Sequence, residues 1–530
     1  MPEWTSEQLS AINSFREPVI VSAAAGSGKT AVLVERTIRI LSDKSLGVPA
    51  DSILAVTFTN DAADQMREKL ANALEEAGDK NPDSDWLQSQ QALLGLASIC
   101  TINSFCFDMV RNNLIGTGFR PGLRIMEKAE ADMISQSAID EVFDRAYLSR
   151  PEDMKRLLDW FSHEGDGSLK SMVLKLWRFE RSIPFRRSWE KTVLDSYKSG
   201  GMTEKALSAL REEVMLRLRT ACGLARSIDK LLERLNYHSG AKKVLSENVA
   251  ECFRIYENAD RLDYYELSSY ILEIGIKSLV GARQKKQEKE SSTPEENAVY
   301  ELLKSFNSGI REELEGVKRL APFFVGANDD SKKSIDCISS LFLLTDELDS
   351  EVYSRKQEKN AIDFSDSELL LVSMLVSCDD DGRLARTDYA KELAFSGRYR
   401  LIIIDEFQDV NNLQEVIFKA ISDSDDLSTL GENVFCVGDV KQAIYRFRQA
   451  NPKIFLNTRE MARAGRVREI LLSKNFRSRP SVLDFSNYVF SSLMSDELGE
   501  VTYDESEMLV PGRKEDKDGS PTEIILCNKE

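Results

Sequence analysis

The sequence predicts an α/β protein in which a parallel-sheet domain is interrupted by a large helical insertion. Four short apolar runs lack the strict alternation of a half-exposed strand, so we expect strands buried on both faces, as in a parallel sheet. Helix-like stretches follow two of these runs, which gives the strand, loop, helix order of α/β folds. A long middle region with helical spacing separates the first two runs from the last two.

The strands and helices of this domain are expected at defined positions. The expected strands are Val19–Val21, Ile53–Phe58, Leu401–Ile404 and Val434–Val437. Helices are expected over Lys29–Leu41 and Ala62–Ala77. Gly78 is expected to end the second helix, because glycine commonly follows a helix C-terminus.

The middle of the chain, from about residue 111 to 360, is rich in Leu, Glu, Lys and Arg with helical spacing. One apolar stripe falls on a single helix face and predicts core packing. It consists of Leu207, Leu210, Val214, Leu218 and Ala221. The charged run Gly281–Ser292 lacks apolar anchors and predicts an exposed loop. Thr293 and Glu296 then have the spacing of a capping box, with Pro294 at the first helical position.

Bulk composition limits the classes of protein that fit. A chain of 530 residues exceeds what one core usually supports, so we expect two to four domains. The net charge of −18 argues against extensive nucleic-acid contact but leaves room for one basic track. The eight cysteines form no CxxC pair and lie away from His163 and His238, so we expect neither zinc nor disulfides. The polar N-terminus and short apolar runs predict a cytoplasmic protein without a membrane span.

The strongest local signal is a glycine-rich turn between an expected strand and an expected helix, the context of a phosphate-binding P-loop. The turn consists of Ala23, Ala24, Ala25, Gly26, Ser27, Gly28, Lys29 and Thr30. Lys29 would reach the β- and γ-phosphates of ATP, and the Thr30 hydroxyl would ligate Mg²⁺. The usual first glycine of the motif is Ala23 here. The alternative is a strand–helix turn that binds no nucleotide.

A P-loop needs a second metal ligand and a group that activates water. Asp405 and Glu406 follow the apolar run Leu401–Ile404 and supply both. Asp405 would hold Mg²⁺, and Glu406 would orient and deprotonate the attacking water. An apolar run before two acids is weak evidence alone, but together with a P-loop it predicts an ATP hydrolase.

From this point the chain resembles a known family. The run Asp405–Asp409 resembles motif II of UvrD-like superfamily 1 DNA helicases, and other motifs of that family occur in the family's order. They are Thr5–Gln8 (Q motif), Val56–Asn60 (motif Ia), Thr101–Cys106 (motif Ib), Val437–Arg448 (motif III) and Asn475–Ser478 (motif IV). The resemblance implies a RecA-like ATP-binding domain 1A at 1–110 and 361–465, a helical domain 1B at 111–360 and the start of domain 2A at 466–530.

The resemblance also implies roles around ATP. Gln8 would hydrogen-bond the adenine edge, and Arg36 and Phe476 would stack on either side of the base. Gln442 would sense the γ-phosphate and couple it to the DNA site, and Arg477 would contact the γ-phosphate as an arginine finger does. The expected catalytic residues are therefore Lys29, Asp405, Glu406, Gln442 and Arg477.

The expected track for single-stranded DNA combines aromatic side chains, which stack on any base, with polar side chains, which hold phosphates. It consists of Phe58, Thr59, Asn60, Asn103, Tyr445, Phe447 and Arg448. The alternative for Phe58 and Phe447 is an ordinary core position. Asn103 stands where many relatives have His, and Asp61 adds a negative charge beside the track, which would weaken binding there.

Other polar residues near the motifs are expected to have structural roles. Asp409 is interpreted as a hydrogen-bonding acid rather than a catalytic one. Gln414 and Asn475 are interpreted as organisers of loops. Asp363 and Asp366 are interpreted as helix caps rather than DNA contacts.

Within the family, three features favour the AddA branch of helicase–nuclease proteins: the form of motif III, Ile362–Asp366 ahead of motif II, and Gly499–Asp504 after motif IV. The resemblance implies a motor that uses ATP to translocate on single-stranded DNA, expected 3′→5′, and to unwind duplex in double-strand break repair with an AddB-type partner. Motifs V and VI have no match, so we expect a fragment that binds ATP but hydrolyses it poorly. The alternatives are a stand-alone UvrD-type repair helicase and a non-catalytic scaffold that binds ATP or DNA.

Overall fold

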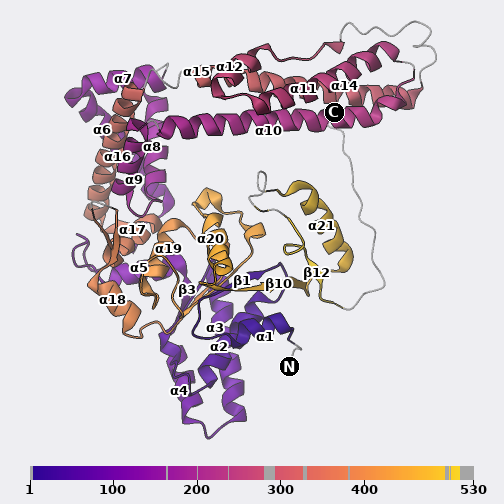
Figure 1. Ribbon diagram of the computed structural model, residues 1–530. Helices are drawn as coiled ribbons and strands as arrows, with labels where there is room; N and C mark the ends of the chain where they lie inside the picture. The colour runs from indigo at the N-terminus through magenta and orange to yellow at the C-terminus, as the bar shows by residue number, and fades with distance from the viewer. Residues whose placement is uncertain are drawn as a thin grey trace. The chain divides into compact units, whose positions relative to one another are not determined.

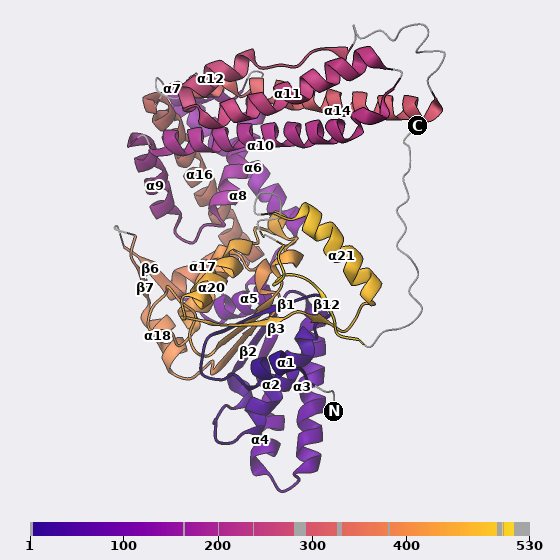
Figure 2. The same cartoon turned by 45° about the vertical axis from the view of Figure 1, so that its right-hand side comes forward.

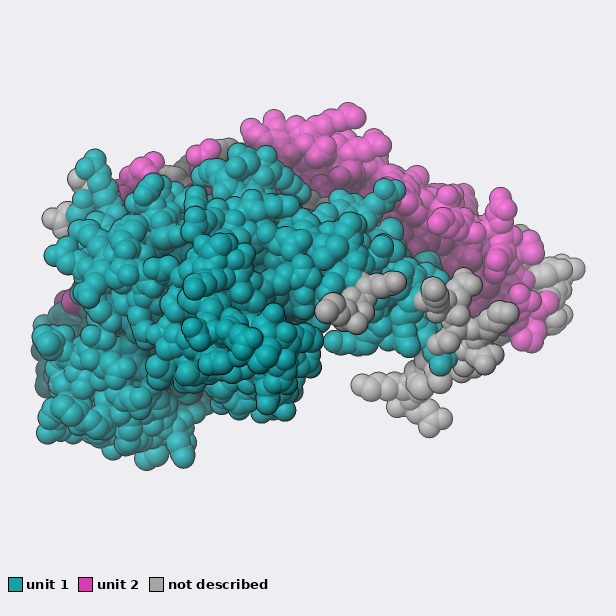
Figure 3. All heavy atoms as spheres, turned by 90° about the horizontal axis from the view of Figure 1, so that it is seen from below, with its two compact units in different colours: residues 1–151, 162–188, 344–530 teal, residues 152–161, 189–343 magenta. Residues whose placement is uncertain are grey.

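The computed structural model describes residues 4–162, 165–199, 201–236, 238–279, 293–325, 331–379, 382–495, 501 and 503–513 (Figure 1). The chain divides into two compact units, coloured separately in Figure 3. Unit 1 comprises residues 1–151, 162–188 and 344–530, and unit 2 comprises residues 152–161 and 189–343. The expected loop Gly281–Ser292 lies outside the described residues, as do His163, Gly499, Glu500 and Thr502.

A six-stranded sheet with the order β10-β1-β9-β8-β2-β3 forms the centre of unit 1. Every neighbouring pair in it is parallel. Its strands are β1 (Val19–Ala23), β2 (Ile53–Thr57), β3 (Ser98–Thr101), β8 (Leu401–Ile404), β9 (Val434–Gly438) and β10 (Arg468–Leu472). The prediction of a parallel α/β sheet is confirmed, and the four expected strands all lie in it. The sheet continues past residue 465, where the sequence placed the end of its first domain.

Both faces of the sheet are covered by helices, because successive side chains of each strand point to opposite sides. Val19 and Val21 belong to the core on one face, whereas Ile20 belongs to the core on the other. The first face carries α1 (Ser6–Asn13), α2 (Lys29–Ser42), α3 (Asn60–Lys80) and α4 (Asp85–Leu94). The second carries α5 (Ile102–Asn112), α17 (Phe364–Leu375), α18 (Asp388–Phe395), α19 (Asn412–Ile421) and α20 (Pro452–Arg463) (Figures 1 and 2).

The expectation that Gly78 ends the second helix is wrong, because α3 continues to Lys80. A Cβ atom at Gly78 would lie 2.7 Å from Nε2 of Gln91. That amide instead donates a hydrogen bond of 3.1 Å to the carbonyl oxygen of Leu74. Glycine at this position therefore allows the close approach of α4 to α3 and does not stop the helix.

The remaining elements of unit 1 surround the sheet. They are α6 (Lys128–Ser149), α8 (Gly167–Glu180), α21 (Pro480–Leu493), the second half of α16 (Ser331–Lys359), β4 (Arg124–Ile125) paired with β5 (Ala361–Ile362), β6 (Val376–Cys378) paired with β7 (Leu384–Arg386), and β11 (Lys474–Asn475) paired with β12 (Val510–Pro511). Short 3-10 turns occur at Ala50–Ser52, Leu232–Arg234, Phe407–Asp409, Val440–Gln442 and Arg446–Arg448. Asp363 and Asp366 form a reciprocal capping box at the start of α17, so their prediction as helix caps is confirmed.

Unit 2 is helical. Its described helices are α7 (Pro151–Phe161), α9 (Arg186–Lys198), α10 (Gly201–Leu231), α11 (Ser239–Arg261), α12 (Tyr264–Glu273), α14 (Pro294–Lys318), α15 (Ala321–Val325) and the first half of α16. The predicted stripe on α10 packs in its core, with Val214 and Ala221 fully buried. Thr293 caps α14 as predicted, but Glu296 bonds the backbone of Asn236 and not that of Thr293. Among the described helices, none has the length and apolarity needed to cross a bilayer.

Candidate functional site

The glycine-rich turn lies at the carboxyl end of β1, where ligands of open parallel sheets usually bind. Gly26 and Gly28 have φ angles of +70° and +85°, which L side chains rarely adopt. These two residues turn the chain between β1 and α2. Helix α2 then begins at Lys29 without a side-chain cap. Its first N–H groups therefore have no side-chain acceptor, and they can donate to a phosphate.

Two acidic residues follow β8 at the same edge of the sheet. Nζ of Lys29 lies 3.3 Å from Oε2 of Glu406. Glu406 has a φ of +53°, an uncommon left-handed conformation for a residue with a side chain. The pKa of Asp405 is raised to about 6, chiefly by burial and then by the Glu406 carboxylate, while Lys29 opposes the rise. The P-loop lysine and both acids predicted from sequence are thus neighbours.

The donor set at this edge suits a magnesium ion. Thr30 supplies a hydroxyl at the start of α2, and Asp405 supplies a carboxylate at the end of β8. Hard oxygen donors of this kind bind Mg²⁺, which in nucleotide sites takes one or two protein ligands together with phosphate oxygens and waters. Because burial disfavours the negative charge of Asp405, a divalent cation beside it would be favourable. The residues present therefore fit Mg²⁺.

A glutamine links the acids after β8 to the turn after β9. Nε2 of Gln408 donates hydrogen bonds of 3.0 Å to Glu406 and of 3.0 Å to Asp409. Oε1 of Gln408 accepts a 2.9 Å bond from the backbone N–H of Asp439. Nε2 of Gln442 donates a 2.8 Å bond to the Asp439 carboxylate. One continuous polar chain thus runs from the P-loop to the expected γ-phosphate sensor.

Asp409 lies beside this chain. The pKa of Asp409 is raised to about 6 by burial and then by Glu406, while the bond from Gln408 opposes the rise. Its Oδ1 atom is buried without a hydrogen-bond partner among the described residues. The hydrogen bond from Gln408 agrees with its interpretation as a hydrogen-bonding acid.

The segment that follows β10 contacts the P-loop directly. Nδ2 of Asn475 donates a 2.6 Å bond to the carbonyl oxygen of Ala25, and the N–H of Phe476 donates a 2.9 Å bond to that of Gly26. Oδ1 of Asn475 accepts from the N–H groups of Arg477 and Ser478. Asn475 therefore organises this loop, as predicted. A Cβ at Gly26 would lie 2.7 Å from that of Arg477, which places Arg477 against the turn.

The two residues of α1 and α2 that were expected at the adenine are both buried. Gln8 lies at the start of α1, where Nε2 donates a 3.0 Å bond to the carbonyl oxygen of Ser27 in the P-loop. The expected stacking role of Arg36 is contradicted. Its guanidinium is 2% exposed, bonds the carbonyl of Ala11 and the hydroxyl of Ser14, and lies 4.2 Å from the ring centre of Phe435. Arg36 is thus a buried residue under the sheet, whereas Phe476 is 38% exposed.

Four of the residues expected to contact DNA form one cluster. The ring centroids of Phe58 and Tyr445 are 4.3 Å apart, and those of Tyr445 and Phe447 are 5.7 Å apart. The guanidinium of Arg448 lies 5.6 Å from the Phe58 ring and 6.0 Å from the Phe447 ring. Phe447 is 77% exposed, so the core alternative is wrong for this residue. Phe58 is half-buried under its neighbours.

The other three expected DNA residues lie near the carboxyl ends of β2 and β3. Thr59 caps α3, since its hydroxyl accepts from the N–H of Ala62. Asn60 is exposed in the first turn of that helix, next to the exposed Asp61. Asn103 is half-buried in the first turn of α5, which begins directly after β3. These side chains follow strands of the same sheet, at the edge that carries the P-loop.

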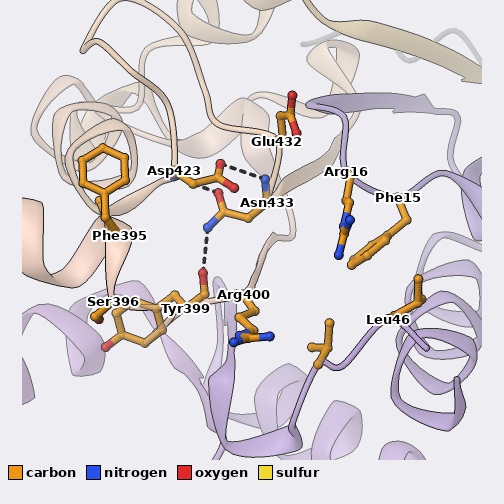
Figure 4. Close-up of a pocket in the computed structure, with 13 residues that line it drawn as sticks. Phe15, Arg16, Leu46, Phe395, Ser396, Tyr399, Arg400, Asp423, Glu432 and Asn433 are labelled. Atoms are coloured by element: carbon orange, nitrogen blue, oxygen red, sulfur yellow. Dashed lines mark hydrogen bonds between the residues drawn. The ribbon is translucent and has the colours of Figure 1, made fainter. Parts of the chain in front are cut away.

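A separate cavity of about 350 Å³ lies at the opposite edge of the sheet (Figure 4). Tyr399 and Arg400 line it just before β8, and Asn433 lines it just before β9. Nδ2 of Asn433 donates a 2.7 Å bond to the carbonyl oxygen of Tyr399. Since these residues precede the strands that Asp405 and Asp439 follow, the cavity is not part of the candidate site.

Three residues of the site had no role in the sequence interpretation. Gln408 and Lys441 lie inside the runs quoted for motifs II and III, so the motifs marked their positions but not their contacts. Glu507 pairs with Lys441, 66 residues away along the chain. No pattern in the sequence indicated that pairing.

Comparison with known proteins gives consistent matches. The UvrD/REP helicase N-terminal domain matches residues 4–463. The AddA protein of Clostridium perfringens strain 13, an ATP-dependent helicase/nuclease, is 34% identical over 96% of this chain and 40% of its own length. The proteins of the same name from Clostridium beijerinckii and Clostridioides difficile are 34% and 32% identical, over 43% and 42% of their lengths. The chain thus spans about two fifths of the relatives it matches.

Proposed function

The chain belongs to the UvrD/REP helicase family, and from this premise we propose that it forms the ATP-binding part of a motor that moves along single-stranded DNA. The motifs that suggested a UvrD-like helicase of the AddA type are confirmed by the family match and by the relatives. The observation that carries the proposal is the convergence of Lys29, Glu406 and Asn475 on one glycine-rich turn. Glycines and charges arranged in this way are typical of a phosphate site.

The proposal gives each residue at the turn a task. Lys29 and the N–H groups of α2 bind the ATP phosphates, and Thr30 and Asp405 hold Mg²⁺, which supplies charge neutralisation for phosphoryl transfer. Glu406 accepts the proton of the attacking water. Arg477 and Gln442 contact the γ-phosphate from the turns after β10 and β9. Each contact places positive or hydrogen-bonding groups where the transition state spreads its charge.

The adenine site requires a revision. Because Arg36 is buried under Phe435, we propose that the base stacks on Phe476 alone among the two expected partners. Gln8 would exchange its bond to Ser27 for one to the adenine edge. Binding of the base would in this way be linked to the backbone of the P-loop.

On the other side of motif III, we propose that Phe447 and Arg448 contact single-stranded DNA together with Phe58 and Tyr445. Exposed aromatic rings stack on bases at about 1–3 kcal/mol each without reading their identity. Gln442 and Tyr445 are three residues apart, so one short turn would join the γ-phosphate to the DNA track. Thr59, Asn60 and Asn103 would hold phosphates along the same edge.

In domain terms, we propose that the sheet of unit 1 is the RecA-like domain 1A and that the mainly helical region 111–360 is domain 1B. Because β10 pairs with β1, we propose that domain 1A extends through Leu472 and that domain 2A starts after it. Translocation 3′→5′, duplex unwinding in double-strand break repair and an AddB-type partner are also proposed. They follow from the name and length of the relatives and not from any contact in this chain.

A binding measurement tests the nucleotide site. Titration of a fluorescent ATP analogue in the presence of Mg²⁺ should show a Kd that rises about 10-fold to 100-fold in Lys29→Ala, because a charge-assisted phosphate contact is lost. Lys44→Ala, an exposed lysine just after α2, is the matched control and should leave the Kd unchanged. Equal affinity in both variants would overturn the assignment of the P-loop.

A turnover measurement tests the motor itself. ATP hydrolysis by the chain, and by one of its full-length relatives, should rise when single-stranded DNA is added. If both proteins bind ATP and DNA yet neither hydrolyses ATP, the motor is wrong and the non-catalytic scaffold replaces it.

A further inference from the structure

A buried glutamate from the end of the described chain reaches the turn that carries Gln442. The carboxylate of Glu507 is 4% exposed and forms ion pairs with both Lys441 and Arg459. Arg459 lies in α20 and also pairs with Glu469 in β10, at 2.6 Å. Glu507 therefore joins the turn after β9 to the edge of the sheet, through side chains that are almost fully shielded from water.

Lys441 passes this connection on to Asp439. Nζ of Lys441 lies 3.0 Å from Oδ1 of Asp439, whereas Nε2 of Gln442 donates to the other oxygen, Oδ2, at 2.8 Å. The lysine ammonium thus divides its charge between Asp439 and Glu507. If Glu507 lost its charge, Asp439 would be the only carboxylate paired with this buried ammonium. The attraction between them would strengthen and draw Asp439 away from the Gln442 amide.

The same segment also supports the turn after β10. Its strand β12 pairs with β11, which contains Asn475. The N–H of Gly512 donates a 2.8 Å bond to the carbonyl oxygen of Asn475. A Cβ at Gly512 would lie 2.7 Å from the ring of Phe476, so glycine is needed for the ring to pack there. Residues 503–513, which we name the brace, therefore contact both turns that face the P-loop.

We propose that Glu507 is a positioning residue for nucleotide sensing: by holding Lys441 it keeps Asp439 bonded to the amide of Gln442, and so sets that amide for the γ-phosphate. The inference rests on the proposed function, since it gives Gln442 the γ-phosphate as its ligand. Stability alone does not explain the arrangement, because a buried ion pair seldom stabilises a fold more than apolar residues of the same size. An arrangement that controls the orientation of one amide has a use for the charges.

The proposal is tested by the ratio of affinities for AMP-PNP and ADP, both with Mg²⁺, because only the first carries a γ-phosphate group. Glu507→Gln should reduce the preference for AMP-PNP by at least about fivefold, with ADP affinity unchanged, as expected for loss of one oriented hydrogen bond. Glu505→Gln, an exposed neighbour in the brace, is the control and should keep the wild-type ratio.

A second variant protects the test from misfolding. Lys441→Met leaves Glu507 paired with Arg459, so no buried charge is stranded, and it should lower the same ratio. If both variants bind ADP normally and keep the wild-type ratio, the positioning role is overturned while the nucleotide site stands. If the wild-type chain binds neither nucleotide, the proposed function fails and the inference fails with it.

Discussion

The ammonium of Lys29 lies 3.3 Å from the carboxylate of Glu406, so the P-loop lysine and the acid after β8 form an ion pair across the phosphate site. Glu406 also accepts a hydrogen bond from Gln408 and adopts a left-handed backbone conformation. ATP phosphates and Glu406 would compete for the same lysine. Nucleotide binding should therefore depend on the charge of a residue that does not itself bind phosphate.

Glu406→Gln is predicted to bind AMP-PNP with Mg²⁺ more tightly than wild type, by about twofold to tenfold, because Lys29 no longer forms an ion pair with a carboxylate. ATP turnover should fall to background in the same variant, since no group remains to accept the proton of water. Calorimetric titration and a phosphate-release assay measure the two effects. Weaker binding of AMP-PNP than in wild type would contradict the competition.

The raised pKa values near this ion pair predict a dependence of stability on pH. The pKa of Asp409 rises from 3.8 to about 6, through burial and the nearby Glu406. An acid with a raised pKa binds more protons in the folded state, so its contribution to stability falls as pH increases from about 4 to 6. Asp409→Asn removes this loss and keeps an acceptor for Gln408.

The variant should therefore gain stability relative to wild type as pH rises from 4.5 to 7.5, by about 1 kcal/mol after allowance for partial exposure. Thermal melts in Mg²⁺-free buffer at both values measure the difference. Asp425→Asn, an exposed acid, serves as control and should show the same offset at both pH values. A gain for Asp409→Asn at pH 4.5 that disappears at pH 7.5 would have the wrong sign.

Two glycines with similar backbone angles separate strain from close contact. Gly26 and Gly465 have φ values of +70° and +74°. A Cβ at Gly26 would meet Arg477 at 2.7 Å and Asn475 at 2.9 Å, whereas one at Gly465 would meet nothing within 4 Å. Both alanine variants should lose about 1–3 kcal/mol of stability to backbone strain. Only Gly26→Ala should also abolish binding of the fluorescent ATP analogue, because it displaces the turn after β10.

Sequence patterns predicted the centre of the sheet better than its edges. Val19–Val21 and Leu401–Ile404 are buried on both faces, and such runs stand out by their continuous apolar character. Strand β10 escaped prediction because it alternates between exposed and buried residues at the sheet edge, and β3 because only one of its four residues is buried. Arg36 was misassigned although it is spaced with Val32 and Ile40 on the buried face of α2.

At the site, adjacency in sequence decided what was predictable. Lys29 and the Asp405–Glu406 pair could be found because phosphate chemistry requires those residue types after strands of one sheet. Glu507 could not be found, since its value depends on two single side chains, Lys441 and Arg459, that lie 66 and 48 residues away. Contacts of this kind are set by the folded chain and leave no local pattern.

Phe447 is predicted to contribute to DNA binding without contributing to stability. Its ring is 77% exposed and lies 5.7 Å from that of Tyr445. Phe447→Ala should weaken binding of an oligothymidylate by about 1–3 kcal/mol, roughly 5-fold to 100-fold, with an unchanged melting temperature. Phe395→Ala is the control, because Phe395 is 57% exposed but lines the cavity at the opposite sheet edge (Figure 4). Equal DNA affinity in both variants would remove Phe447 from the track.

Lys356 in α16 is predicted to be essential for the stability of unit 1. It is 1% exposed and pairs with Asp363 at 2.6 Å and Asp366 at 2.7 Å. Lys356→Met leaves these two carboxylates with Arg181 as their remaining cation and should cost about 3–5 kcal/mol. Lys359→Met, an exposed lysine one turn further on, should cost less than about 0.5 kcal/mol.

A double variant separates the loss of charge balance from the loss of volume. Adding Asp366→Asn to Lys356→Met removes one of the stranded carboxylates while keeping the size of the side chain. If unbalanced charge causes the loss, the double variant should be more stable than Lys356→Met alone, since each buried carboxylate then has a cation. If the two changes instead add, the damage is steric, and the capping box at α17 depends on the shape of Lys356 and not on its charge.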